Sequence, residues 1–181
     1  MQHRLNTLRR QAGITIVECA VTTAVLAMLT SQVVPGLSAT AEKQRLEGVA
    51  AQLRTDVQYT RSQAISLNRT LRISFDASAG AGCYVVHTGE ANQCSCNADG
   101  TAAVCTAGAE PMRSVRLEPA QRVSLSANVR SMLFDPAKGT ITPAATLKVQ
   151  GKSGAAIHQV VNIMGRVRTC SPGGTAGHPA C

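Results

Sequence analysis

Two arginines close to the C-terminus are the residues best suited to chemistry in this chain. They lie in the segment Gly165-Arg166-Val167-Arg168. On a strand, Arg166 and Arg168 point to one side and Val167 to the other. Guanidinium groups bind phosphate oxygens in a bidentate manner, and Gly165 would let a phosphate approach the backbone. The segment predicts a phosphate-binding surface; the alternative is a solvated strand face with Val167 in the core.

Positive charge is concentrated in the same part of the chain. Residues 113–181 carry nine basic and two acidic side chains, a net charge of +7, whereas residues 38–112 carry six and seven, a net charge of −1. This asymmetry favours a polyanion or an anionic surface as partner; the alternative is a basic domain kept soluble by its charge. From charge alone, we expect Arg130, Lys148 and Lys152 to extend the basic patch.

No pattern typical of an enzyme occurs in the sequence. The motifs of serine hydrolases, zinc proteases, phosphate-binding loops and dinucleotide-binding folds are all missing, and the acidic residues form no pair at a suggestive spacing. We therefore predict a protein that is not an enzyme and that uses no cofactor. The histidines are His3, His87, His158 and His178.

An apolar run near the N-terminus predicts a membrane helix. Ile14 to Leu37 comprises 24 residues with a single acid, Glu18, and no base. As a helix it would be about 36 Å long, enough for a bilayer core of roughly 30 Å. The three arginines ahead of it would hold the N-terminus in the cytoplasm, so that the rest is exported. The alternative, a secretory signal cleaved at Ala39-Thr40-Ala41, is disfavoured because the run exceeds the usual apolar region.

Glu18 needs an explanation, because an unpaired carboxylate in a membrane helix costs about 2 to 3 kcal/mol. It is either an acid tolerated near the headgroups or the partner of a cation. Proteolysis after Gly13 would create that cation, the α-amino group of Ile14, for the Glu18 of a neighbouring copy. This arrangement resembles the type IV pilin and type II secretion pseudopilin families, although Ile14 replaces their usual Phe. The resemblance implies cleavage by a prepilin peptidase after Gly13 and a role of Glu18 in filament assembly.

Six cysteines in the exported part predict three disulfides, because that compartment is oxidising. Cys170 and Cys181 form the natural terminal pair. Cys83, Cys94, Cys96 and Cys105 permit three pairings, of which the one that joins Cys94 to Cys96 has the poorest geometry. The alternative is a zinc site completed by His87 or His178, which the C-x-C spacing disfavours.

The remaining pattern predicts one long helix followed by short strands. Apolar residues recur at threes and fours up to a stop at Asn68, while the charged residues, Asp56 included, fall mostly on other faces. This stripe comprises Leu46, Val49, Ala50, Leu53, Val57, Ala64 and Ile65. Alternation then predicts strands near residues 71–75, 83–87, 115–117, 123–125, 132–134, 140–142, 146–150, 157–163 and 166–170, with residues 89–111 as a disulfide-pinned loop. We expect a leader (1–13), a helix (14–67, with 14–37 transmembrane) and an exported α+β domain with an antiparallel sheet or sandwich (68–181).

The exported part also resembles the FimT/GspH branch of minor pilins and pseudopilins. The shared features are the helix, the alternating strands, the turn from Phe134 to Gly139 and the Gly-Arg-x-Arg-x-Cys ending. The resemblance implies a long helix packed on a two-sheet β domain. In FimT-type members tied to natural competence, the G-R-x-R stretch is implicated in DNA binding, which implies Gly165, Arg166 and Arg168 here.

The function that this resemblance implies is that of a minor type IV pilin. It would lie in the bacterial inner membrane with its C-terminal domain in the periplasm, join a pilus with other pilin subunits, and capture extracellular DNA for natural transformation. Four aromatic residues cannot build a base-stacking platform, so DNA contacts should be to phosphates and independent of sequence. The alternative is a structural subunit of a type II secretion or pilus assembly, whose basic face contacts another subunit or anionic lipid.

Overall fold

The computed structural model describes residues 15–77, 81–97, 103–106, 108–174 and 177–181. The expected cleavage site at Gly13 and Ile14 lies outside these residues. The chain divides into two compact units, Met1–Thr40 and Ala41–Cys181, and each is described by itself.

The first unit contains the beginning of helix α1 (Ile16–Leu67). Thr15 precedes the helix, and its Oγ1 accepts a hydrogen bond of 3.3 Å from the backbone N–H of Glu18. This contact satisfies one of the free amides of the first turn, where an acidic residue is also favoured by the helix dipole. Large apolar side chains are exposed along this stretch, from Ile16 to Leu29. Among the described residues, no helix is both long and apolar enough to cross a membrane.

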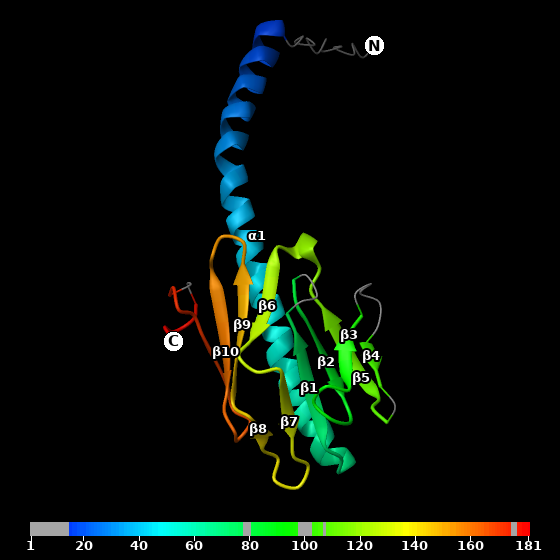
Figure 1. The fold of residues 1–181 in the computed structure, drawn as a ribbon. Helices are drawn as coiled ribbons and strands as arrows, with labels where there is room; N and C mark the ends of the chain where they lie inside the picture. The colour runs from blue at the N-terminus through cyan, green and yellow to red at the C-terminus, as the bar shows by residue number, and fades with distance from the viewer. Residues whose placement is uncertain (1–14, 78–80, 98–102, 107, 175–176) are drawn as a thin grey trace, which may run out of the picture. The chain divides into compact units, whose positions relative to one another are not determined.

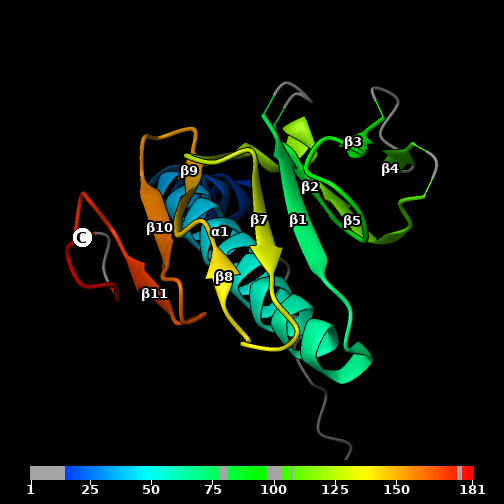
Figure 2. The ribbon, with the colours of Figure 1, turned by 60° about the horizontal axis from the view of Figure 1, so that its bottom comes forward.

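The second unit places the later turns of α1 against two antiparallel sheets (Figures 1 and 2). The five-stranded sheet has the order β5-β2-β1-β7-β8 and the four-stranded sheet the order β11-β10-β9-β6. Their strands are β1 (Leu71–Asp76), β2 (Cys83–His87), β5 (Pro111–Arg116), β6 (Val123–Ala127), β7 (Ser131–Phe134), β8 (Ile141–Thr142), β9 (Ala145–Gly151), β10 (Ala156–Val161) and β11 (Val167–Cys170). A short 3-10 helix, η1 (Pro119–Gln121), precedes β6. The predicted α+β class with a long helix on a two-sheet β domain is confirmed.

One hydrophobic core joins the helix to both sheets. Leu46, Leu53 and Val57 of α1 are buried with side chains from both sheets, such as Ile73 and Leu147. The buried members of this core all lie between residues 46 and 167. Because they all belong to the second unit, this unit has a core of its own.

The predicted apolar stripe of the helix is largely correct but misplaces two side chains. Ile65 is 48% exposed, whereas Asp56, expected on another face, is only 1% exposed. The Asp56 carboxylate accepts a hydrogen bond of 2.5 Å from the Tyr84 hydroxyl and lies 3.2 Å from Nε of Arg113. These two partners compensate the cost of burying a charge, which periodicity alone cannot reveal. Burial, followed by the bond to Asp56, raises the pKa of Tyr84 well above its usual value.

The stretch from Gly89 to Pro111 is more regular than the predicted loop. It contains the antiparallel strands β3 (Cys94–Cys96) and β4 (Ala103–Cys105). The disulfide Cys94–Cys105 joins opposite residues of this hairpin, and Cys83–Cys96 ties the hairpin to β2. Strands of three residues with few apolar side chains leave too little alternation to be recognised in the sequence.

The third disulfide joins Cys170 to Cys181, the terminal pair that the sequence suggested. It brings the end of the chain back beside the end of β11, where the N–H of Ser171 donates to the carbonyl of Pro179 at 2.9 Å. Figure 2 shows β11 at the outer edge of its sheet, with the C-terminus next to it. The tail therefore lies along the end of an edge strand.

Candidate phosphate-binding surface

The arginine segment begins at a tight turn formed by residues 162–165. The N–H of Gly165 donates to the carbonyl of Asn162 at 2.9 Å, which closes the turn. The side chain of Asn162 accepts a second bond, of 2.8 Å, from the N–H of Arg166. We expected the strand to continue to Ile163, but β10 ends at Val161 and Ile163 lies in this turn. Asn favours turns because its side chain bonds to nearby backbone groups, and this signal competes with the apolar alternation.

Gly165 has a role different from the one we expected. Its N–H is bonded to Asn162, and its carbonyl accepts a bond of 2.9 Å from Nε2 of Gln58 on α1. The N–H, which is the group that could donate to a phosphate, is therefore not free. The residue has a φ of +79°, and a Cβ here would lie 2.7 Å from Cδ and Nε of Arg61. Gly165 is needed because the backbone is left-handed and packs directly against Arg61.

Gln58 and Arg61 are positioning residues that sequence reasoning missed. Arg61 also donates from Nε to the carbonyl of Gly139 at 2.7 Å, so one side chain of α1 contacts two separate turns. Both residues lie at polar positions of α1, whereas the sequence pattern predicts the contacts of this helix only from its apolar stripe. Their targets are backbone groups distant in sequence, so no local signal predicts the contacts.

Arg166 and Arg168 are both exposed, and Val167 between them is buried, as the alternation predicted. Arg168 lies opposite Val160 of β10, and the two arginines line one shallow hollow together with Val160 and Asn162. Among the described residues, no ion pair involves either guanidinium group. The two positive charges are therefore presented side by side to solvent, as binding of an anion requires.

Of the three further basic residues, only Lys148 lies on the same face of this sheet as Arg168, two strands away from it. Lys148 is exposed on β9, opposite His158, which in turn lies opposite Cys170 of β11. Partial burial, and then the charge of Lys148, lower the pKa of His158, so this ring adds no positive charge at neutral pH.

Lys152 and Arg130 lie elsewhere. Lys152 is in the turn between β9 and β10, at the end of β10 opposite to the arginine turn, about 20 Å along a strand of this length. Arg130 follows β6, the strand farthest from β11 in the sheet order, and lines another hollow together with Ser74 and Asp76. The expected patch of five basic residues is thus reduced to Arg166, Arg168 and Lys148, which we call the basic face.

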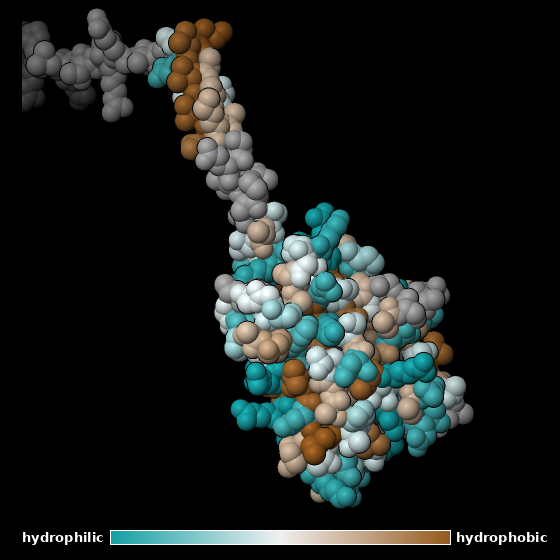
Figure 3. All heavy atoms as spheres, turned by 60° about the vertical axis from the view of Figure 1, so that its left-hand side comes forward, coloured by the Kyte–Doolittle hydropathy of each residue, from teal (hydrophilic) through white to brown (hydrophobic). Residues whose placement is uncertain are grey.

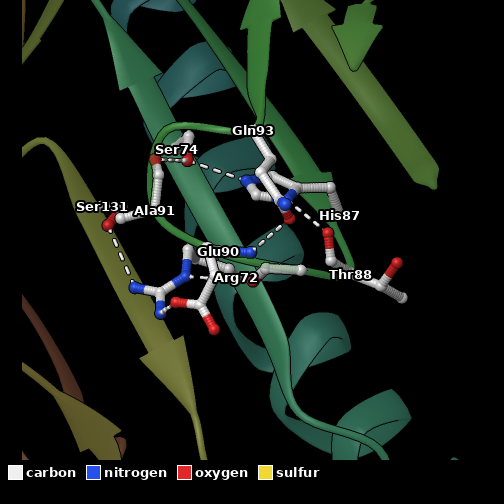
Figure 4. Close-up of polar contacts among 9 residues, drawn as sticks. Arg72, Ser74, His87, Thr88, Glu90, Ala91, Gln93 and Ser131 are labelled. Carbon is white, nitrogen blue, oxygen red and sulfur yellow. Dashed lines mark hydrogen bonds and ion pairs between the residues drawn. The ribbon is translucent and has the colours of Figure 1, made fainter. Parts of the chain in front are cut away.

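A second polar cluster lies on β1 and β2, away from the basic face (Figure 4). Oγ of Ser74 is 2.8 Å from Nε2 of His87, and Nδ1 of His87 is 2.8 Å from the carbonyl of Thr88. Because a carbonyl only accepts, Nδ1 carries the proton and Nε2 accepts from Ser74. Burial is the main cause that lowers the pKa of His87 and keeps the ring neutral.

The surroundings of this Ser–His pair indicate a structural role. His87 is fully buried, and its second nitrogen faces a backbone carbonyl rather than a carboxylate. Oγ of Ser74 also lies 3.2 Å from the carbonyl of Ala91, so its single hydrogen is shared between this carbonyl and Nε2 of His87 and links the segment after β2 to β1. Within the described residues, no group of histidine, cysteine and acidic side chains is arranged to hold a metal ion. The four central cysteines, which were the other candidates for zinc ligands, form disulfides.

Comparison with protein families identifies the chain. The model of the family described as type II transport protein GspH matches residues 49–165, which is more than half of the chain. The chain belongs to the GspH family. This membership confirms the resemblance predicted from the sequence at the level of the family. The match ends at Gly165, so Arg166 and Arg168 of this GspH-family chain lie beyond the segment that identifies it.

Solved structures similar to this GspH-family chain include two minor subunits. The type IV minor pilin FimU of Pseudomonas aeruginosa PAO1 is 20% identical, with 70% of this chain and 89% of that chain covered and a TM-score of 0.48. The minor pseudopilin EpsH of the Vibrio cholerae type 2 secretion system is 12% identical, with coverage of 71% and 98% and a TM-score of 0.49. No curated protein matches the chain.

Substituting Gly165 tests how the turn is held. Gly165→Ala should destabilise the 41–181 unit by about 1 to 2 kcal/mol more than Gly154→Ala, because its methyl group must displace Arg61. Gly154 is a matched control, since its φ is +90° and a Cβ there would meet no atom within 4 Å. Urea unfolding measures both variants. Equal losses would mean that only the left-handed backbone matters and that Arg61 moves freely.

Proposed function

We propose that this GspH-family protein is a minor pilin that binds DNA through its basic face. The observation that supports this most directly is the pair Arg166 and Arg168, exposed side by side and without an ion pair among the described residues. Phosphates spaced along a DNA strand match two adjacent guanidinium groups. The scarcity of aromatic side chains and the lack of a recognition-helix motif favour contacts to the backbone, hence binding independent of sequence.

We also propose how the protein is processed and assembled. A prepilin peptidase would cut between Gly13 and Ile14, and Glu18 would pair with the new N-terminus of a neighbouring subunit. Before assembly the chain would be held in the inner membrane with residues 41–181 in the periplasm. The apolar side chains exposed between Ile16 and Leu29 would then be covered by other pilin subunits in the filament. DNA held at the pilus would serve uptake in natural transformation.

The test is binding of the full chain, in a neutral detergent, to duplexes of unrelated sequence over a series of salt concentrations. We expect similar affinities for all duplexes, near the ~10⁻⁴ to 10⁻⁶ M typical of non-specific binding, and a linear fall of log K with log salt. Several subunits in one filament would raise the apparent affinity. If no duplex binds even at low salt, the second candidate is favoured: a structural subunit of a secretion or pilus assembly, which the family match supports equally well.

A further inference from the structure

Two large apolar side chains stand unburied at the centre of the turn that precedes the arginines. Ile163 and Met164 are 56% and 61% exposed, although the central positions of tight turns usually hold small or polar residues. Val160, in the hollow beside the arginines, is also exposed. Single exposed apolar residues are common. Two adjacent ones at the tip of a turn offer apolar surface whose burial by a ligand would stabilise the complex.

The turn holds these side chains in a fixed position. Its backbone is bonded to two other elements, since the carbonyl of Ile163 accepts from the N–H of Ile141 on β8 at 2.8 Å and the carbonyl of Gly165 accepts from Gln58 on α1. Within the turn, the N–H of Gly165 donates to Asn162. A ligand that contacts the turn therefore loses little free energy in ordering it. Figure 3, which brings the side of β10 in Figure 1 forward, shows hydrophobic patches interspersed with hydrophilic ones on the domain.

The apolar turn and the arginines are parts of one surface. Arg166 follows the turn directly, and its N–H is bonded to Asn162. A ligand that satisfies both parts must carry phosphate charge and an accessible apolar face within the length of one or two nucleotides. In a duplex the base faces are stacked on one another, and only their edges are open in the grooves. In a single strand the base faces are exposed, and covering them with aliphatic side chains removes apolar surface from water without aromatic stacking.

We infer that Ile163 and Met164 contact unpaired DNA bases, so that the basic face prefers single-stranded to duplex DNA. This inference rests on the DNA binding proposed above and specifies its substrate. The arginines supply the charge-dependent part of the affinity, and the turn supplies a part that does not depend on salt. The two contributions can therefore be separated in one experiment.

The experiment measures binding of the full chain, in neutral detergent, to a single strand of about 20 nucleotides and to its duplex, over a salt series. At high salt, where charge contributes least, we expect the single strand to bind more tightly. Ile163→Ser/Met164→Ser should lower the affinity for the single strand about tenfold at every salt concentration, because buried apolar groups are lost. The slope of log K against log salt should stay unchanged, since no charge is removed.

A matched control replaces two exposed apolar residues of the other side of the domain. Val104→Ser/Met112→Ser changes a similar pair on β4 and β5 and should alter neither affinity. Equal losses for single strand and duplex, or no loss for either, would overturn the inference while leaving DNA binding intact. A variant that binds DNA normally but fails to bind vesicles of anionic lipid would assign the turn to a membrane surface and also overturn it. Absence of binding to both DNA forms by the unaltered chain would overturn the proposed function, and this inference with it.

Discussion

Replacing Arg166 and Arg168 together by glutamine should lower the affinity for duplex DNA about 60-fold at 0.1 M salt. Both guanidinium groups are exposed on one hollow, and no ion pair among the described residues would compensate their removal. Each lost phosphate contact reduces the number of released counterions. The slope of log K against log salt should therefore flatten by up to about 1.8 for two contacts. Fluorescence anisotropy over a salt series gives both values.

The control must remove the same charge at another place. Arg130→Gln/Lys152→Gln does so, and both of these residues lie away from the basic face. We expect a loss of a few-fold at most from this variant, because exposed charges more than a Debye length of about 10 Å away are largely screened at 0.1 M salt. Equal losses from the two double variants would mean that net charge, rather than this site, determines binding. Unchanged binding in Arg166→Gln/Arg168→Gln would leave DNA as a partner but place its contacts elsewhere.

Tyr84→Phe should lower the free energy of unfolding of the 41–181 unit by about 1.5 to 3 kcal/mol, the range for a hydrogen bond to a charged group. The substitution keeps the ring and removes only the hydroxyl that donates to Asp56 at 2.5 Å. Arg113 is then the remaining partner of the carboxylate. Its side chain is partly solvent-exposed, so the ion pair compensates the buried charge of Asp56 only weakly. Urea unfolding followed by circular dichroism measures the change, and the slope m should stay the same.

Two further variants separate this bond from the general effect of losing a hydroxyl. Tyr59→Phe makes the same chemical change on an exposed side chain and should cost less than about 0.5 kcal/mol. In the background of Asp56→Asn, the cost of Tyr84→Phe should shrink, because the charged acceptor is gone. A cost of Tyr84→Phe no larger than that of Tyr59→Phe would show that Asp56 does not need this donor.

The parts of the fold that the sequence predicted are those dictated by local periodicity. The apolar residues of α1 from Leu46 to Ala64 repeat at helical spacing, and the strands between Leu71 and Cys170 other than β3 and β4 are marked by apolar alternation, so their existence was predictable. Asn68, at which we expected the helix to stop, has a left-handed φ of 48° directly after its last residue. The ends of the strands were predicted less well. Ile163 was assigned to β10 because an apolar residue in a turn continues the alternation of the strand before it.

The parts that could not be predicted depend on contacts between residues distant in sequence. Asp56 is buried only because Tyr84 and Arg113 reach it from two strands. Arg130 and Lys152 have the expected charge, but the sheet order separates Arg130 from Arg168, and Lys152 lies at the opposite end of β10. The alternation of Arg166, Val167 and Arg168 predicted the orientation of the two arginines correctly. It could not predict that Gln58 and Arg61 hold the preceding turn.

The tail closed by Cys170–Cys181 also limits how subunits can associate. An edge strand presents unpaired backbone groups, which invite another chain to add a strand to the sheet. Here the returning chain occupies the end of that edge, since Ser171 pairs with Ala180 and its N–H donates to Pro179. Strand addition is thereby hindered at this end of β11, without any charge placed there for the purpose. A second chain that approaches this end of β11 meets the tail instead of free backbone groups, which lowers the risk of β-aggregation there.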